Sequence, residues 1–208
     1  MTKVGAMRVE DVMRLAPVIP VLVIDDIADA VPIATALVAG GLPVLEVTLR
    51  TGAALDVIRA MSAVEGAVVG AGTVLEPRGL DAALDAGARF IVSPGLTEPL
   101  ARAAMDRRVP FLPGVATAGD VLRGLDLGLT HFKFFPAVAS GGIPALRALT
   151  APFAHVRFCP TGGITQESAA EWLALDEVLC VGGSWLVSRN RLDAGAIEVG
   201  ARMTAALR

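Results

Sequence analysis

Val44-Leu45-Glu46-Val47-Thr48-Leu49-Arg50 alternates aliphatic and polar side chains, which is the two-residue period of a β-strand. It contains one of eight short runs rich in β-branched or aromatic residues along the 208-residue chain. The runs expected to be strands are 18–24, 44–48, 68–71, 90–93, 111–114, 131–135, 157–160 and 178–181. Stretches rich in alanine and leucine with helical spacing lie between them, among them 27–39, 54–61, 80–85 and 99–107.

Strand and helix units that recur every twenty-odd residues predict a (β/α)8 TIM barrel, an α/β fold that forms a single domain over residues 1–208. An additional N-terminal helix over residues 9–15 precedes the barrel, and a helix over residues 193–207 closes it. An open doubly wound sheet is disfavoured, because Asp25 and Asp26 stand where a glycine-rich turn would follow the first strand. A leucine-rich solenoid has a similar period, but its leucine and asparagine signature is missing.

Several of the expected helices end in a glycine just before the next strand. These glycines are Gly40, Gly66, Gly87 and Gly128. A glycine at this position usually adopts the left-handed conformation that terminates a helix. We therefore expect a positive φ at each of them.

The composition indicates a globular protein that acts on small molecules, with 54% apolar and 19% charged residues. The net charge is -3 and the arginines are scattered, so neither a nucleic acid nor an anionic membrane is an expected partner. The N-terminus has no apolar stretch of signal-peptide length. The longest apolar region, 30–47, is interrupted by prolines, glycines and Glu46, which excludes one membrane helix. We expect a cytoplasmic protein.

The few cysteines and histidines argue against metal chemistry. Cys159 and Cys180 lie in short apolar runs, where buried reduced thiols are expected. With only two histidines besides, His131 and His155, no cluster has the spacing of metal ligands. His131 shares a strand face with Lys133 but lies nearer the strand's start, so we expect it in the core. We expect neither a metal nor another cofactor.

Lys133 is one of only two lysines in the chain and lies in the apolar run Phe132-Lys133-Phe134-Phe135-Pro136. Apart from Lys3, the other basic side chains are arginines, which keep their proton at any working pH. A desolvated lysine can lose its proton and attack a carbonyl, as Schiff-base catalysis requires. The alternative is a structural lysine whose stem packs on aromatic rings while its ammonium reaches water.

Other polar residues stand at the ends of the expected strands, where the active site of a barrel lies. Glu46, Thr48 and Arg50 share one face of the second strand, and we expect that face to point into the barrel. Thr73 and Pro94 follow the third and fourth strands. Together with the lysine, a carboxylate offers a proton shuttle and a guanidinium can bind a substrate carboxylate. These groups suit cleavage of a carbon-carbon bond next to a 2-oxo acid, although a structural pair between Glu46 and Arg50 is the alternative.

Paired glycines at the last two strands indicate a phosphate site. Gly162-Gly163 follows the seventh expected strand, and Gly182-Gly183 follows the eighth. Barrel enzymes often bind phosphate there through backbone N-H groups. Tight turns use the same residues, so either pair alone says little.

Five segments of the chain strongly resemble the 2-keto-3-deoxy-6-phosphogluconate (KDPG) aldolase and 4-hydroxy-2-oxoglutarate aldolase family. They are LEVTLRT (45–51), GAGTV (70–74), FKFFPA (132–137), RFCPTGGI (157–164) and CVGGSWL (180–186). The resemblance implies a class I, Schiff-base aldolase, an aldehyde-lyase of the Entner-Doudoroff pathway. It would cleave KDPG to pyruvate and D-glyceraldehyde 3-phosphate, act also on 4-hydroxy-2-oxoglutarate, and form a homotrimer.

The resemblance also implies a role for individual residues. Lys133 matches the family's Schiff-base lysine and Glu46 its general acid/base. The pyruvyl end of the substrate would be bound by Arg50, Thr73 and Pro94. Thr161 matches a position tied to stereochemical preference. The phosphate end would be bound by Gly162, Gly163 and Ser184.

Three alternatives remain open. A sister group that cleaves the galactonate-derived epimer shares the same lysine and glutamate. A phosphate-binding barrel could isomerise or decarboxylate a sugar phosphate without a covalent step, with Lys133 acting only as a charge. A barrel without enzymatic activity could bind a phosphorylated ligand as a sensor or scaffold. Borohydride reduction in the presence of pyruvate separates the covalent mechanism from the last two.

Overall fold

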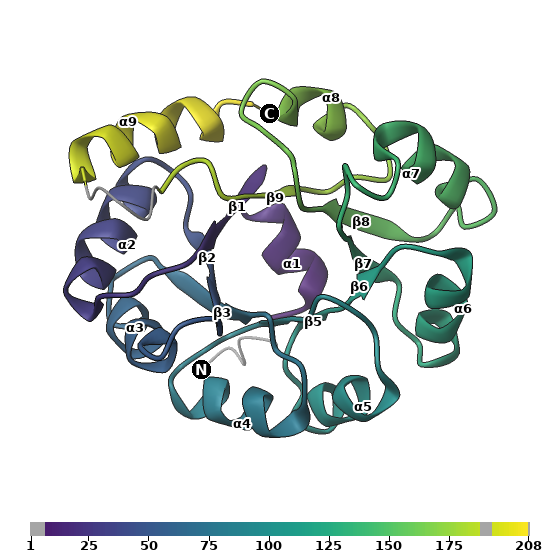
Figure 1. The fold of residues 1–208 in the computed structure, drawn as a ribbon, viewed down its shortest axis with the longest axis horizontal. Helices are drawn as coiled ribbons and strands as arrows, with labels where there is room; N and C mark the ends of the chain where they lie inside the picture. Colours follow the sequence, from purple (N-terminus) through teal and green to yellow (C-terminus); the bar gives the residue numbers. More distant parts are fainter. Residues whose placement is uncertain (1–6, 188–192, 208) are drawn as a thin grey trace, which may run out of the picture.

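The computed structural model describes residues 7–187 and 193–207 as an α/β fold, with parallel strands at the centre and helices around them (Figure 1). The strands are β1 (Val18–Leu22), β2 (Val44–Thr48), β3 (Val68–Gly72), β4 (Ile91–Val92), β5 (Phe111–Leu112), β6 (Gly114–Val115), β7 (His131–Phe134), β8 (Arg157–Pro160) and β9 (Val181–Gly183). The helices are α1 (Val9–Arg14), η1 (Ile27–Asp29), α2 (Ala30–Ala39), α3 (Ala54–Ser62), α4 (Pro77–Asp85), α5 (Glu98–Asp106), α6 (Ala118–Asp126), α7 (Gly142–Thr150), α8 (Ala169–Leu173) and α9 (Ala194–Ala205). In this part of the chain no helix is long and apolar enough to cross a membrane.

The strands pair in parallel as two sheets, one of six strands in the order β5-β4-β3-β2-β1-β9 and one of three in the order β6-β7-β8. The expected fifth strand, 111–114, contributes to both sheets. Pro113, which has no N-H to donate, separates β5 from β6. Isolated parallel bridges join Phe158 to Val178 and Thr161 to Gly182, between β8 and the β9 segment.

The predicted bounds of β2 and β8 are confirmed, but the last strand is displaced from its predicted position at 178–181. β9 begins at Val181, and Val178 forms only an isolated bridge. The pair Gly182-Gly183 therefore lies within the strand and pairs with β1, so its prediction as a loop after the strand is wrong. The prediction followed the run of aliphatic residues, which ends at Val181. The backbone hydrogen bonds of the strand continue through Gly182 and Gly183, which have no side chain to indicate a strand.

The glycines at the ends of the helices are explained by two different structural requirements. A positive φ is confirmed at Gly66, Gly87 and Gly128. Gly40, however, has a φ of -78°, and the left-handed residue is Gly41 at 91°. A Cβ on Gly40 would lie 2.4 Å from the Cβ of Ala201. Gly40 is therefore explained by close packing of α2 against α9, and the prediction for it was wrong.

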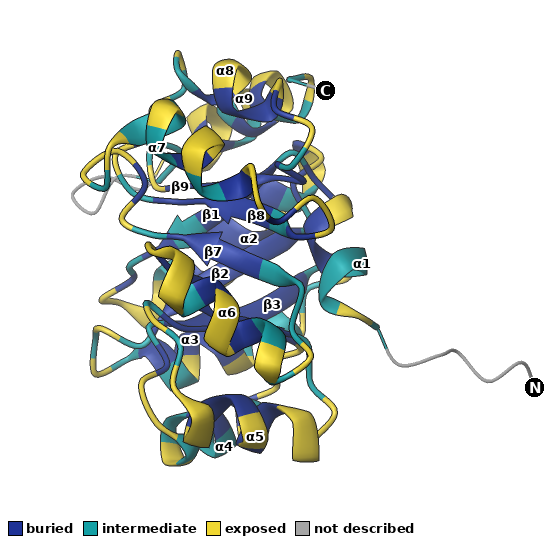
Figure 2. Cartoon of the chain, turned by 90° about the vertical axis from the view of Figure 1, so that its right-hand side faces the viewer, coloured by how far each residue is buried: buried dark blue, intermediate teal, exposed yellow. Residues whose placement is uncertain are grey.

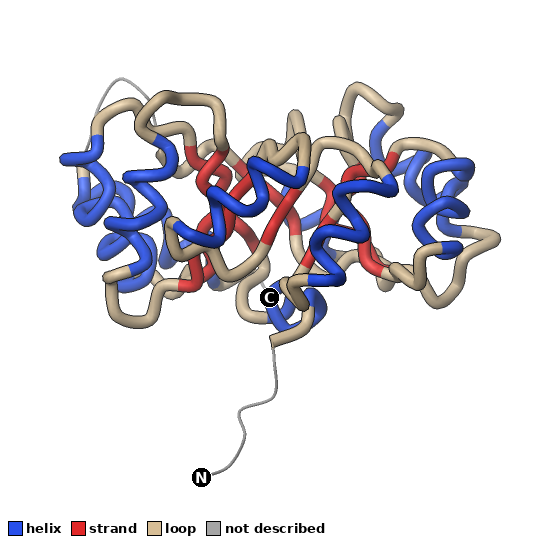
Figure 3. Tube along the Cα trace, turned by 90° about the horizontal axis from the view of Figure 1, so that it is seen from below, coloured by secondary structure: helices blue, strands red, loops and turns tan. Residues whose placement is uncertain are grey.

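The two faces of β2 pack against different parts of the molecule. Leu45 and Val47 belong to an apolar cluster with residues of α2 and α3, on the outer side of the strands. Val44 points to the other side and clusters with Val12 and Met13 of α1. In Figure 1 α1 lies within the ring of strands, and Figure 3 shows it beyond one end of them. Figure 2 shows the strands largely buried, with the exposed residues on the outer faces of the helices and in the loops.

Because α1 immediately precedes β1 and contacts the first residues of β2 and β3, it covers the end where the strands begin. The side chains that follow on the same interior face lie toward the ends of the strands. Glu46 of β2 and Lys133 of β7 are among them.

Candidate active site

Lys133 and Glu46 form a buried pair between strands that are not neighbours in a sheet. Lys133 Nζ lies 3.1 Å from Glu46 Oε1 and 3.5 Å from Oε2. Their side chains are only 7% and 4% exposed. The alternative in which the lysine ammonium reaches water is therefore wrong. The described contacts also pair Glu46 with Lys133 and not with Arg50.

The surroundings of Lys133 are aromatic. Its Nζ lies 5.3 Å from the centroid of the Phe135 ring, within the range of a cation-π contact. Phe132 and Phe134, on the opposite face of β7, pack in the outer core. The alternation of the strand thus places the amine inside and the two flanking rings outside.

Thr48 connects Arg50 to the first strand. The Thr48 hydroxyl donates to the Leu22 carbonyl at 2.9 Å and lies 3.5 Å from Arg50 Nε, which donates to it. Thr48 is buried and Arg50 is exposed beyond the end of β2. The guanidinium keeps most of its N-H donors available for an anionic ligand.

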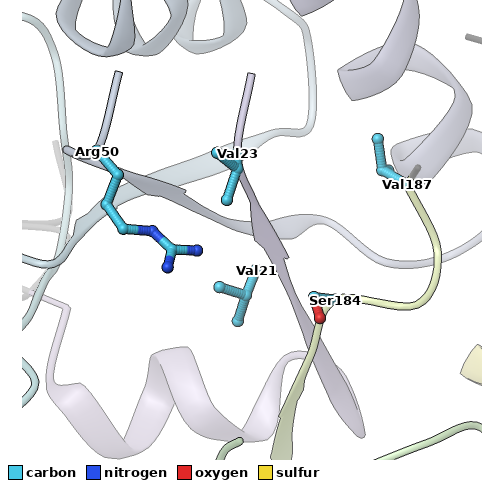
Figure 4. Close-up of a pocket in the computed structure, with 5 residues that line it drawn as sticks. All are labelled: Val21, Val23, Arg50, Ser184 and Val187. Carbon is cyan, nitrogen blue, oxygen red and sulfur yellow. The ribbon is translucent and has the colours of Figure 1, made fainter. Parts of the chain in front are cut away.

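Arg50 and Ser184 line a pocket of about 580 Å³ together with Val21, Val23 and Val187. Figure 4 shows the Arg50 side chain extending into this space from one side and Ser184 lying on another. Val21 is also the register partner of Glu46 on the neighbouring strand, so both side chains lie on the same face of the sheet. The pocket therefore borders the strand that carries Glu46.

Thr73 lies directly after β3 in a left-handed conformation, with a φ of 58°. This conformation is uncommon for a residue with a Cβ and costs about 1–2 kcal/mol. The Val74 N-H donates to the Val92 carbonyl at 3.2 Å, which anchors the turn to β4. The turn therefore holds Thr73 in a strained conformation at the strand end where the site was predicted.

Pro94 lies in a turn that packs against β6. The buried Ser93 hydroxyl donates to the Gly95 carbonyl at 2.6 Å and closes this turn. A Cβ on Gly114 would lie 2.1 Å from the Pro94 carbonyl oxygen, so the turn packs directly on that glycine. Gly114 is the register partner of Lys133. The structure thus places Pro94 one strand from the lysine.

The glycine pair after β8 forms a loop that is bonded to the segment after β7. Gly162 and Gly163 have φ angles of 103° and 79°, which favour glycine. The N-H groups of Ala137 and Val138 donate to the carbonyl oxygens of Thr161 and Gly162, at 2.8 and 3.0 Å. Thr161 itself is buried. The loop therefore lies beside the segment that follows β7, the strand that carries Lys133.

The core placement expected for the two cysteines is confirmed, but the placement expected for His131 is wrong: this first residue of β7 is only half-buried, because it lies at the end where the strand begins. Cys159 and Cys180 are both buried. His131 Nδ1 lies 3.0 Å from the Thr130 hydroxyl, and its Nε2 is buried without a partner among the described residues. Burial lowers the pKa of His131, while the charge of Glu10 opposes that shift.

Several residues near the predicted site were not predicted. Val21 and Val23 line the pocket, and their alternate positions in the run 18–24 already place them on one strand face. Val187 also lines it, but no pattern in the sequence indicates this. Gly72 lies against the Glu46 side chain, which only the packing between β2 and β3 reveals.

A buried amine hydrogen-bonded to a carboxylate, beside a pocket lined by a guanidinium, provides the nucleophile and the proton carrier that an enzyme acting through a lysine Schiff base requires. Residues 9–201 match the family model described as KDPG and KHG aldolase. The chain belongs to the KDPG and KHG aldolase family.

Relatives in this family cover nearly the whole chain. The 2-dehydro-3-deoxy-phosphogluconate aldolase of Zymomonas mobilis is 58% identical over 200 residues, which is 96% of each protein. The crystal structure of 2-keto-3-deoxy-6-phosphogluconate aldolase from Zymomonas mobilis ATCC 29191 superposes with a TM-score of 0.96 at 57% identity, covering 97% of this chain and 98% of that one. A KDPG aldolase structure from Legionella pneumophila, with pyruvate captured as a covalent carbinolamine, has a TM-score of 0.90 at 42% identity, covering 97% and 98%.

Proposed function

We propose that this enzyme is a class I aldolase that cleaves KDPG to pyruvate and D-glyceraldehyde 3-phosphate, and that it also acts on 4-hydroxy-2-oxoglutarate. The observation that carries the proposal is the buried Lys133 and Glu46 pair, with 3.1 Å between Nζ and Oε1. An amine and a carboxyl group at this distance can exchange a proton directly, which generates the neutral amine that a Schiff base requires.

In the proposed reaction Lys133 Nζ adds to the C2 carbonyl of the substrate and forms a carbinolamine. Glu46 donates a proton to the departing hydroxyl, and water leaves as the iminium forms. Loss of the C4 hydroxyl proton then breaks the C3-C4 bond, whose electron pair moves toward the iminium nitrogen. This step releases the aldehyde and leaves an enamine. Protonation at C3 and addition of one water return pyruvate and the free amine.

The substrate would lie between two anion-binding ends. We assign its carboxylate to Arg50, which can present two parallel N-H donors, and the adjoining pyruvyl group to Thr73 and Pro94. Thr161 is assigned to discrimination at C4. The phosphate is assigned to the Gly162 and Gly163 loop and the Ser184 hydroxyl. A pocket of about 580 Å³ that contacts both Arg50 and Ser184 supports this arrangement.

The two sheets are inferred to form one closed eight-stranded barrel with an additional N-terminal helix, as a single domain over residues 1–208. The fifth run, divided at Pro113, pairs with β4 through β5 and with β7 through β6. Isolated bridges between β8 and the β9 segment, together with the pairing of β9 and β1, support closure on the other side.

We further propose a cytoplasmic homotrimer that needs no cofactor and has neither a nucleic acid nor a membrane as partner. The proposed chemistry uses only an amine and a carboxylate of the chain itself. The small net charge of -3, with no basic cluster in the sequence, supports the absence of a polyanionic partner. The trimer is supported by the family resemblance.

The test is borohydride reduction of the purified enzyme with and without pyruvate, together with an assay of KDPG cleavage. We expect inactivation only when both reagents are present, with one reduced pyruvyl group on Lys133 by peptide mass spectrometry. Lys133→Arg is the control, because a guanidinium keeps the positive charge but forms no Schiff base. Cleavage without trapping would reject the covalent mechanism, and trapping without cleavage would reject KDPG as the substrate. The galactonate-derived epimer, assayed in parallel, tests the C4 assignment.

A further inference from the structure

We infer that Gly72 is a positioning residue for the aldol cleavage: its missing side chain leaves the space through which the Glu46 carboxylate reaches Lys133. The inference rests on the proposed function, because it assigns Gly72 an effect on the proton transfers of Glu46. Gly72 is the last residue of β3, next to the strand that carries Glu46.

The geometry around Gly72 is dominated by one side chain. A Cβ built on Gly72 would lie 2.2 Å from Glu46 Oε1, 2.7 Å from Cγ and 2.8 Å from Cδ. These separations are far below the distance of a van der Waals contact. The Glu46 side chain thus occupies the position that a side chain at residue 72 would need.

The backbone itself does not require a glycine at this position. Gly72 lies in regular strand geometry and pairs with Thr48, and it is not among the glycines with a positive φ. Its carbonyl accepts the Leu49 N-H at 2.8 Å, an ordinary contact between parallel strands. Space, and not conformational freedom, therefore explains the glycine.

Gly70, two residues earlier on the same face of β3, provides a contrast. A Cβ there would lie 2.4 Å from the Phe90 ring, which is buried in the interior cluster with α1. Gly70 thus makes room for a core side chain, whereas Gly72 makes room for a charged side chain of the site. A substitution at Gly70 would disturb packing, and one at Gly72 would disturb the pair of Glu46 and Lys133.

The expected consequence of Gly72→Ala follows from which atoms can move. The three nearest atoms, Cγ, Cδ and Oε1, all belong to the Glu46 side chain and none to the backbone, so we expect this side chain to be displaced while the two strands stay in place. A displacement of about 1 Å breaks the hydrogen bond to Lys133 and is enough to slow an enzyme about 10²-fold. We expect kcat for KDPG cleavage to fall about 10- to 10²-fold, with KM changed less than about threefold, because Glu46 moves protons and Arg50 binds the substrate.

Four variants test this inference alongside the parent enzyme: Gly72→Ala, Gly79→Ala, Glu46→Ala, and Gly72→Ala combined with Glu46→Ala. Gly72→Ala is compared with Gly79→Ala in α4, where the nearest atoms to an added Cβ are 3.7 Å away. The combined variant removes the atoms that the new methyl group would meet. Relative to Glu46→Ala alone, the combined variant should show no further loss of kcat, because residues that act through one group are not additive.

The outcomes separate the two proposals. If the parent does not cleave KDPG, the proposed function fails independently of Gly72. If the parent cleaves KDPG and Gly72→Ala retains parental kcat, or if its loss adds fully to that of Glu46→Ala, the inference about Gly72 is wrong. If Gly72→Ala unfolds only when Glu46 is present, the conflict with that side chain is confirmed. If it unfolds in both backgrounds, Gly72 has a structural role and the inference is overturned.

Discussion

At the scale of single residues, the Lys133 amine and the Glu46 carboxylate depend on each other because both side chains are nearly inaccessible to water. Removing one partner of a buried charged pair typically costs 3–5 kcal/mol, since the other charge is left unpaired. The amine that attacks the substrate carbonyl must be neutral, so transfer of a proton from Lys133 to Glu46 would begin the proposed catalytic cycle.

Glu46→Gln tests the proton transfer with little change in side-chain size. We expect kcat for KDPG cleavage to fall by about 10² to 10⁴, because an amide cannot act as a general acid or base. Steady-state kinetics on a variant shown to be folded by circular dichroism provide the measurement. A raised KM with an unchanged kcat would assign Glu46 a structural role instead.

His131 predicts a dependence of stability on pH. Burial lowers its pKa in the folded protein, so the unfolded chain binds the proton more readily. The stability contributed by neutral His131 is complete above the ordinary histidine pKa of about 6.5, and it is lost as the pH falls below that value toward the folded pKa.

When the pH is lowered from about 7.5 to about 5.5, the free energy of unfolding should therefore fall less in His131→Gln than in the parent. This window spans the ordinary histidine pKa. Urea unfolding at equal protein concentration measures this difference. Glu10 raises the His131 pKa, whereas the charges of Arg157, Arg14 and Arg8 lower it, so these side chains set the size of the effect. Parallel pH dependence in parent and variant would contradict the assignment.

At the scale of elements, the loop after β8 depends on the segment after β7. Two hydrogen bonds join Ala137 and Val138 to that loop, and Val138 packs against Gly163. A Cβ on Gly163 would lie 2.8 Å from the Val138 Cβ. These contacts therefore couple the loop assigned to phosphate to the strand that carries Lys133.

Gly163→Ala should separate the two ends of the substrate. We expect the kcat/KM of KDPG cleavage to fall more than about tenfold, because the methyl group displaces the loop and strains a backbone with a φ of 79°. Exchange of the methyl protons of pyruvate with solvent should stay within about twofold of the parent, because this reaction needs only Lys133 and Glu46. Nuclear magnetic resonance of pyruvate in deuterated buffer measures the exchange.

Gly128→Ala is the matched control for this prediction. Gly128 has a φ of 78°, and no atom lies within 4 Å of an added Cβ. The variant carries the same backbone strain, about 1–2 kcal/mol, away from the proposed site. It should keep parental kcat/KM, and loss of both activities in folded Gly163→Ala would instead show that the loop also orders Lys133.

At the scale of the whole molecule, the homotrimer is open to a direct measurement. Light scattering after size exclusion should give a mass of about three times the 21.4 kDa of one chain. Large apolar side chains such as Leu75, Val199 and Met203 are 59–65% exposed in the single chain, so subunit association has apolar surface to bury. A mass of one or two chains would reject the trimer.

The sequence by itself determined most of the strand and helix pattern and singled out Glu46 and Lys133 as the pair proposed to react. Alternation in β2 and β7 depends only on local backbone geometry, so it placed Glu46 and Lys133 on interior faces before any contact was known. It also separated Leu45 and Val47 from the polar face, and both pack outward as expected. The local pattern was sufficient for this prediction because a charged residue among aliphatic residues in a strand is unusual and indicates a partner or a function.

The tertiary structure alone decided which groups meet. Glu46 and Lys133 are 87 residues apart, and their contact depends on how β2 and β7 lie across the interior. The reasons for Gly40 and Gly72 also became visible only there, because each is fixed by a neighbouring element and not by its own backbone. In the sequence, a glycine needed for close packing looks the same as a glycine needed for a turn. The sequence shows that the side chain is missing, but only the structure shows which neighbouring atom occupies the space.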